Sequence, residues 1–226
     1  MALNQSDPAY NQAMTHYLAG DWEAAKSAFQ DLVQAHPAEP FVLLLLGNIH
    51  YSLGDLDTAV EIYTKATELN PEFGIAFYKL GVCYYRMGRL ERALKAFNAV
   101  IEAKSQSHAM ASYFVGLINL FLGRDQEAEE GFENLRNRSK ESRIANFYLA
   151  QLKIKRKQFT EALPLLQELV DRNSEFAEVH YMLGVVQYGL HNNTEAIASF
   201  RRALEINPAD ERSKTKLTLL TDVQWP

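Results

Sequence analysis

The sequence predicts an all-α fold, a solenoid in which pairs of helices stack on one another. The first observation is a repeat: Leu46-Gly47 returns as Leu80-Gly81 after 34 residues, and Leu183-Gly184 follows Leu46-Gly47 by four such steps and one inserted residue. The second is that apolar residues inside each repeat follow helical spacing. A period of this size is typical of solenoids built from helical hairpins.

On this period we place six repeats, each read as helix, tight turn and helix, and a terminal segment. His108 is the single inserted residue, and residues 211–226 are a capping helix and tail. The six repeats are 6–39, 40–73, 74–107, 109–142, 143–176 and 177–210.

The repeat at 40–73 shows why each element is expected. Leu43, Leu46 and Ile49 share one face of a first helix. Gly54-Asp55 breaks that helix and starts the second, and Asn70-Pro71 closes the second, because proline has no amide to continue the helix. Along the chain, small residues recur at two positions where the helices of a pair must approach closely: Ala13, Gly47, Gly81, Gly116, Ala150 and Gly184, and Ala25, Ala59, Ala93, Ala128, Ala162 and Ala196.

The chain resembles the tetratricopeptide repeat family over about residues 6–210. The resemblance is carried by Leu-Gly, Gly-Asp, alanine, an aromatic residue and a closing proline at these offsets. The repeats at 40–73, 74–107 and 177–210 match well, whereas others depart from the pattern, as where Lys157-Gln158 replaces Gly-Asp. The resemblance implies a right-handed superhelix whose first helices line a concave surface.

The resemblance also implies that one face of each first helix binds a peptide. Tyrosine dominates two series of positions on this face, seven residues apart. Tyrosine suits peptide binding because it offers apolar area and a hydroxyl, but it is also common at these positions in the family. Asn48 is expected to pair with a ligand's main chain, with a solvated or capping role as the alternative. The candidate peptide-binding residues are Tyr10, Tyr17, Leu44, Asn48, Tyr51, Tyr78, Tyr85, Tyr113, Phe147, Tyr181 and Tyr188.

Composition narrows the function classes. The net charge of -5 argues against nucleic acid or an anionic membrane as the main partner. The single cysteine, Cys83, excludes an intrachain disulfide, and it suits a reducing compartment as well as a cysteine-poor periplasmic protein; we expect a cytoplasmic location. The amino terminus lacks the pattern of a signal peptide.

No motif points to catalysis, a metal or a cofactor, so we expect that the protein is not an enzyme. His16 and His50 are equivalent core positions, whereas His36, His108 and His191 are expected in turns. Eight Lys or Arg residues against one Glu between residues 136 and 157 could dock an acidic partner, or could form ordinary solvated faces.

The sequence therefore predicts a non-catalytic scaffold or adaptor that binds a peptide segment of another protein. A clamp for a chaperone's carboxyl terminus is not expected, because only Lys79 occupies one of its positions. Two alternatives stay open: a helical repeat protein that binds single-stranded RNA, and the regulatory lobe of a larger enzyme. Trp225 in the tail either folds back on the capping helix or docks on a second molecule, which would give self-association.

Overall fold

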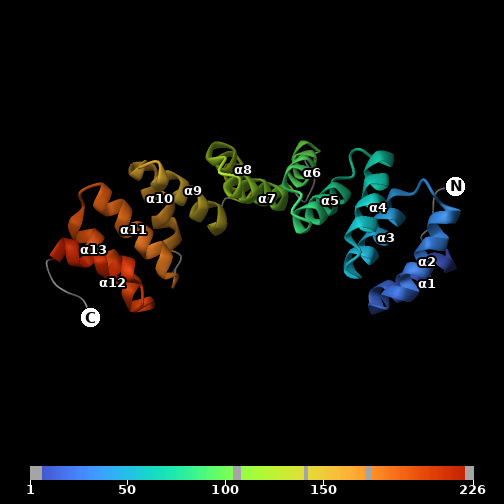
Figure 1. The fold of residues 1–226 in the computed structure, drawn as a ribbon, viewed down its shortest axis with the longest axis horizontal. Helices are drawn as coiled ribbons and strands as arrows, with labels where there is room; N and C mark the ends of the chain where they lie inside the picture. Colours follow the sequence, from blue (N-terminus) through green and yellow to red (C-terminus); the bar gives the residue numbers. More distant parts are fainter. Residues whose placement is uncertain (1–6, 104–107, 140–141, 172–174, 222–226) are drawn as a thin grey trace. The chain divides into compact units, whose positions relative to one another are not determined.

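The computed structural model describes residues 7–103, 108–139, 142–171 and 175–221. Within these ranges it has thirteen α-helices and no strand, which confirms the predicted all-α class (Figure 1). The first twelve helices follow one another as six pairs, and one helix follows them. They are α1 (Pro8–Ala19) and α2 (Trp22–Ala35), α3 (Pro40–Ser52) and α4 (Leu56–Leu69), α5 (Gly74–Arg86) and α6 (Leu90–Glu102), α7 (His108–Phe121) and α8 (Asp125–Arg138), α9 (Arg143–Lys155) and α10 (Phe159–Asp171), α11 (Ala177–Gly189) and α12 (Asn193–Ile206), and α13 (Glu211–Thr221).

The turn inside each pair explains where the first helix ends and the second begins. Gly54 has a φ of 82°, a left-handed conformation that glycine adopts without steric cost and that ends helices. Asp55 then caps α4, because its Oδ1 accepts a hydrogen bond from the backbone N–H of Thr58 at 3.3 Å. The Gly-Asp pair thus breaks and restarts the helix as predicted.

The two helices of a pair approach most closely at the recurrent glycine. A Cβ on Gly81 would lie 2.7 Å from the ring of Phe97 on α6, and one on Gly47 would lie 2.5 Å from the ring of Tyr63 on α4. Both rings are fully buried. Glycine at this position therefore makes room for a large ring from the second helix of the same pair, which accounts for the series of small residues that contains Gly47 and Gly81.

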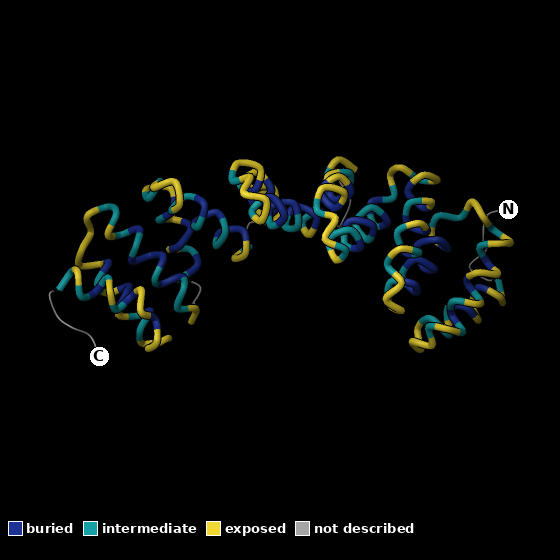
Figure 2. Tube along the Cα trace, in the orientation of Figure 1, coloured by how far each residue is buried: buried dark blue, intermediate teal, exposed yellow. Residues whose placement is uncertain are grey.

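The chain divides into two compact units, Met1–Ile118 and Asn119–Pro226, and the boundary falls within α7. The first unit, unit 1, has a core of two clusters of buried residues, one that extends from α1 to α6 and one formed by α6 and by α7 as far as Ile118. In both units the buried residues lie on the helix surfaces that face neighbouring helices (Figure 2).

In the second unit, unit 2, α13 packs on the last pair as a capping helix. Leu217 of α13 is fully buried and lies in one cluster with Ala196 and Phe200 of α12. This confirms the capping helix predicted after residue 210, whereas the end of the tail, residues 222–226 with Trp225, lies outside the described residues.

One expectation about the histidines is wrong. His36 lies at the C-cap of α2 and His191 lies in a turn with a φ of 64°, as expected. His108, however, is the first residue of α7 and is buried, because the helix takes up the inserted residue that we expected in a turn. The limits of the six repeats stay a prediction. In the described part of the chain, no helix combines the length and the apolar character needed to cross a bilayer.

Candidate functional site

In unit 1 the predicted tyrosines lie at the seams between successive first helices. The side-chain amide of Asn48 on α3 donates to the hydroxyl of Tyr17 on α1 at 3.2 Å. The guanidinium of Arg86 on α5 lies 4.7 Å from the ring centre of Tyr51 on α3. These contacts join α1 to α3 and α3 to α5, so the first helices of this unit lie side by side.

The seam between α5 and α7 is a cluster of aromatic rings. The ring centres of Tyr78 and Tyr85 lie 6.3 Å and 5.2 Å from that of Phe114 on α7, and Phe114 stacks on Phe97 at 4.8 Å. Tyr113 also contacts Phe114, at 5.5 Å. Burial raises the pKa of Tyr78, which fits a ring that is packed between helices. These tyrosines therefore support the packing between helices as well as presenting a surface.

In unit 2 the tyrosines at the same positions meet the capping helix. Arg212 of α13 lies 4.2 Å from the ring centre of Tyr181, and Lys216 of α13 lies 5.4 Å from that of Tyr188. The Arg212 guanidinium also pairs with Glu178 at 2.5 Å. The side chains of α13 thus already occupy one side of these two tyrosines, while Phe147 contacts Phe176 with ring centres 5.7 Å apart.

Three predicted residues are less available to a ligand than the sequence suggests. Tyr10 and Leu44 are only 9% and 5% exposed. The amide of Asn48 is engaged inside the protein: besides donating to Tyr17, its Oδ1 accepts a hydrogen bond from the hydroxyl of Tyr63 at 2.8 Å. A contact between Asn48 and a ligand stays a prediction, but the structure shows it joining α1, α3 and α4.

The structure adds a set of exposed apolar side chains that the sequence interpretation missed. Phe41 and Met110 are the second or third residues of their helices and are 43% and 50% exposed, and Leu18 near the end of α1 is 78% exposed. They lie on the stripe formed by positions i, i+4, i+7 and i+11 of each first helix. We call the unburied part of this stripe in unit 1 the first-helix face: Asn11, Met14, Leu18, Phe41, Asn48, Ser52, Ile75, Lys79, Val82, Arg86, Met110, Phe114 and Leu117.

A sequence signal for this face exists. Phe41, Ile75 and Met110 recur with the period of the repeat, so large apolar side chains occupy an outward helix position three times in succession.

A family model described as Tetratricopeptide repeat matches residues 10–72, 44–108, 78–142 and 147–211. The chain belongs to the tetratricopeptide repeat family. Repeats of this family indicate a protein–protein interaction scaffold.

Solved tetratricopeptide repeat structures resemble the chain in fold. YrrB, described as having an unusual peptide-binding site, is 20% identical with a TM-score of 0.73, and the match covers 84% of this chain and 97% of YrrB. The structure of pilF from Pseudomonas aeruginosa is 14% identical with a TM-score of 0.67, and the match covers 92% of this chain and 94% of pilF. MamA of Desulfovibrio magneticus is 18% identical, with a TM-score of 0.62 and coverage of 76% and 97%. A search of the curated proteins found no match.

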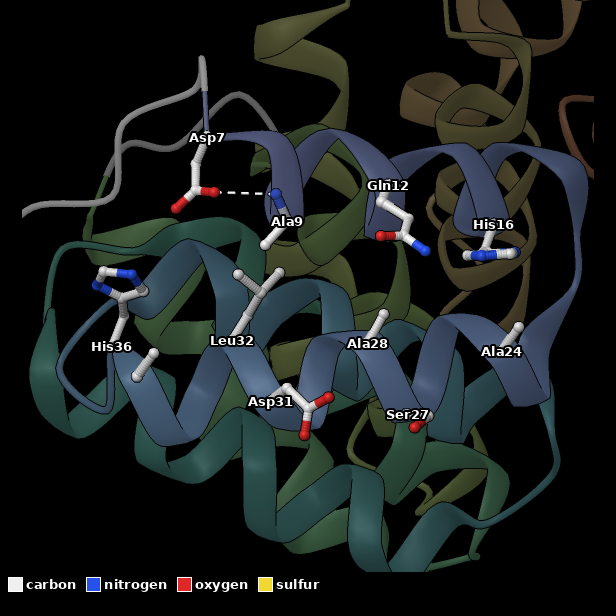
Figure 3. A pocket seen from close by; sticks show the side chains of 11 residues that line it. Asp7, Ala9, Gln12, His16, Ala24, Ser27, Ala28, Asp31, Leu32 and His36 are labelled. Carbon is white, nitrogen blue, oxygen red and sulfur yellow. Dashed lines mark hydrogen bonds between the residues drawn. The ribbon is translucent and has the colours of Figure 1, made fainter.

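The first tetratricopeptide repeat also has a pocket of about 570 Å³ between α1 and α2, which we did not expect from the sequence (Figure 3). Ala24, Ala28 and Leu32 of α2 face Gln12 and His16 of α1 across it. One period later, Leu46 occupies the position of Gln12 and is buried. The pocket is therefore a more polar version of the surface on which repeats pack.

The basic stretch between residues 136 and 157 is largely paired within unit 2. Lys153 lies 2.7 Å from Glu161, and Lys155 lies 2.6 Å from Asp125. Arg156 and Lys153 both pair with Glu129. These cations are compensated by α8 of the preceding repeat and by Glu161 on α10, so they favour the interpretation as ordinary solvated faces.

The isolated cysteine is a core residue of the third tetratricopeptide repeat. Cys83 is fully buried, and burial raises the pKa of its thiol to about 11, against the opposing effect of Arg86 and Lys79. The thiol is therefore protonated at neutral pH, as expected for a small buried hydrophobe. Among the described residues, no group of three His, Cys, Asp or Glu side chains could hold a metal ion.

Proposed function

We propose that the protein is a non-catalytic scaffold or adaptor that binds a peptide segment of another protein on the first-helix face of unit 1. One observation carries the proposal: the exposed side chains Leu18, Phe41 and Met110 extend from three of four adjacent first helices. Exposed apolar side chains that gather on one face mark protein interaction sites. YrrB, with its peptide-binding site on a similar fold, supports the same assignment.

The half-buried tyrosines supply the floor of this surface. Their rings pack across the seams, so they are held in place before a ligand arrives, which lowers the entropic cost of binding. The proposal includes a cytoplasmic location, because the single cysteine is a buried thiol that needs no oxidising compartment.

The test uses a displayed library of random twelve-residue peptides, selected on the wild-type protein. Phe41→Ala with Met110→Ala removes exposed apolar area from the first-helix face and should weaken the selected peptides at least tenfold. The matched control is Leu53→Ala with Leu69→Ala, because these two side chains are also exposed in unit 1, at the end of α3 and on α4. Circular dichroism checks that all variants are folded.

The control variant should bind the selected peptides as the wild type does. The proposal is wrong if the wild type selects no peptide above the bare support. It is also wrong if the double variant on the first-helix face binds as tightly as the control.

A further inference from the structure

The charges of unit 1 are segregated between first and second helices. The helices α1, α3 and α5, and α7 up to Ile118, contain no Asp or Glu. The second helices α2, α4 and α6 carry two, three and two acidic residues. Asp7 and Glu39 are the N-caps of α1 and α3, and the carboxylate of Asp7 faces the pocket between α1 and α2 (Figure 3). The helices therefore put no carboxylate on the first-helix face, although the N-cap Asp7 precedes Phe41 by one period at the edge of this stripe.

Two cations stand on this apolar face, and both belong to α5. Lys79 and Arg86 are seven residues apart, so they lie on one side of the helix, about 10 Å apart along its axis. In the described part of the chain neither side chain forms an ion pair, whereas Arg89, just after α5, pairs with Asp57 of α4 at 3.4 Å. Positive charge is thus left uncompensated where apolar side chains are exposed.

Arg86 is also held in position. Its guanidinium lies 4.7 Å from the ring centre of Tyr51, and this stacking leaves the edge of the planar group available for hydrogen bonds. A guanidinium that is already oriented loses little freedom when it receives a carboxylate, and it can bind both oxygens at once. The apolar surroundings strengthen such a pair once a ligand excludes water.

From this charge complementarity we propose that the peptide segment bound on the first-helix face carries an acidic side chain, Asp or Glu, between apolar residues, and that Lys79 and Arg86 receive it. The inference rests on the proposed function and adds the chemistry of the partner. The apolar residues of the segment cover Phe41, Ile75 and Met110, while the carboxylate sets its register along α5. A segment without a carboxylate would leave both cations desolvated and unpaired, at a cost in affinity.

The experiment uses peptides from the same display library, made synthetically with an amidated C-terminus so that the terminal carboxylate is absent. Each is paired with a twin in which Asp or Glu is replaced by Asn or Gln. Binding is measured by fluorescence anisotropy to the wild type, to Lys79→Met with Arg86→Met, and to Arg92→Met with Lys95→Met. The last variant removes the same charge from exposed positions on α6, where Arg92 lies 5.9 Å from the ring centre of Tyr84.

We expect acidic peptides to dominate the selection and to bind the wild type at least tenfold more tightly than their amide twins. Lys79→Met with Arg86→Met should abolish this difference, and the α6 variant should keep it. Equal binding of the twins, or an unchanged preference in the α5 variant, overturns the inference. If peptides depend on Phe41 and Met110 but show no preference for acids, only the inference fails; if no peptide is selected, the proposed function fails with it.

Discussion

The turn inside each helix pair places its central residue in the left-handed conformation, whichever residue stands there. Gly20, Gly54, Gly88 and Gly123 have φ between 68° and 82°, while Lys157 and His191 have φ of 58° and 64° at the equivalent positions. A residue with a Cβ pays a steric cost of about 1–2 kcal/mol in this conformation. The geometry of the pair therefore overrides the local preference of Lys157 and His191.

We predict that His191→Gly stabilises the protein by about 0.5–1 kcal/mol, because it removes this steric cost but adds freedom to the unfolded chain. The matched change is Gly88→Ala, which should destabilise by about 1 kcal/mol through the backbone alone, since a Cβ there has no neighbour within 4 Å. Midpoints of urea unfolding, followed by circular dichroism, measure both. A loss of stability in His191→Gly would mean that its imidazole makes a contact worth more than the strain.

Asn48 connects three helices through two hydroxyls. The Tyr63 hydroxyl that donates to it belongs to a fully buried side chain, and burial raises the pKa of this phenol well above its ordinary value. Because Tyr17, its other partner, is 31 residues away, this role could not be predicted from the sequence around Asn48.

Asn48→Ala should destabilise unit 1 by about 1–3 kcal/mol, because the Tyr63 hydroxyl then stays buried without an acceptor. Tyr63→Phe removes the donor as well, so the double variant should lose less than the sum of the two single variants. The measurement is a double-mutant cycle in urea. Strict additivity would show that the bond between Asn48 and Tyr63 contributes nothing.

Among the elements, the helix pairs could be predicted because their signals are local. Gly54 and Asp55 end one helix and cap the next, and Gly81 accommodates a ring 16 residues away, so these signals fall within one repeat. The candidate site was predicted only in part. The tyrosine series and the series of Phe41 and Met110 have the same period, and only the packing of the next first helix determines which is covered and which is exposed.

In unit 2, α8 and α9 are joined by an ion-pair network around Glu129. Its carboxylate on α8 pairs with Lys153 on α9 and with Arg156 at the C-cap of α9, and its side chain is only 13% exposed. Burial alone would raise the pKa of Glu129, but hydrogen bonds from Lys153 and Arg156 outweigh it and lower this pKa. The charged form is thus favoured in the folded state.

Because the pKa of Glu129 is lowered in the folded state, the sign of its effect on stability at each pH can be stated. The stabilisation from Glu129 is fully present above the ordinary glutamate pKa of about 4.3 and is lost as the pH falls through the lower folded value. Glu129→Gln should therefore destabilise the protein by about 2 kcal/mol at pH 7, and by progressively less as the pH falls below 4 toward the folded pKa. Glu130→Gln, at an exposed neighbouring position, is the control and should have little effect. The measurement is thermal unfolding of the wild type and both variants across this pH range. A loss of stability in Glu129→Gln that is the same at every pH would contradict the prediction.

At the scale of the whole molecule, the negative net charge and the pairing of cations favour a protein partner over RNA. The chain carries a net charge of -5, and three cations of the basic stretch of unit 2, Lys153, Lys155 and Arg156, pair with Asp125, Glu129 and Glu161. The first-helix face offers only Lys79 and Arg86 to a phosphate backbone. The tyrosines beside this face are half-buried at the seams between first helices, so little of each ring is free to stack on a base.

We therefore predict that a single-stranded RNA of 20 nucleotides does not bind detectably in filter binding at 150 mM salt. Two phosphate contacts would give a slope of only about -1.4 in a plot of log affinity against log salt, too few contacts for tight binding. At low salt any residual binding should disappear in Lys79→Met with Arg86→Met and persist in Arg92→Met with Lys95→Met. Micromolar binding at 150 mM salt with a steeper slope would contradict this prediction. It would show that the RNA contacts more cations than Lys79 and Arg86, and RNA would then be a better candidate ligand than a peptide.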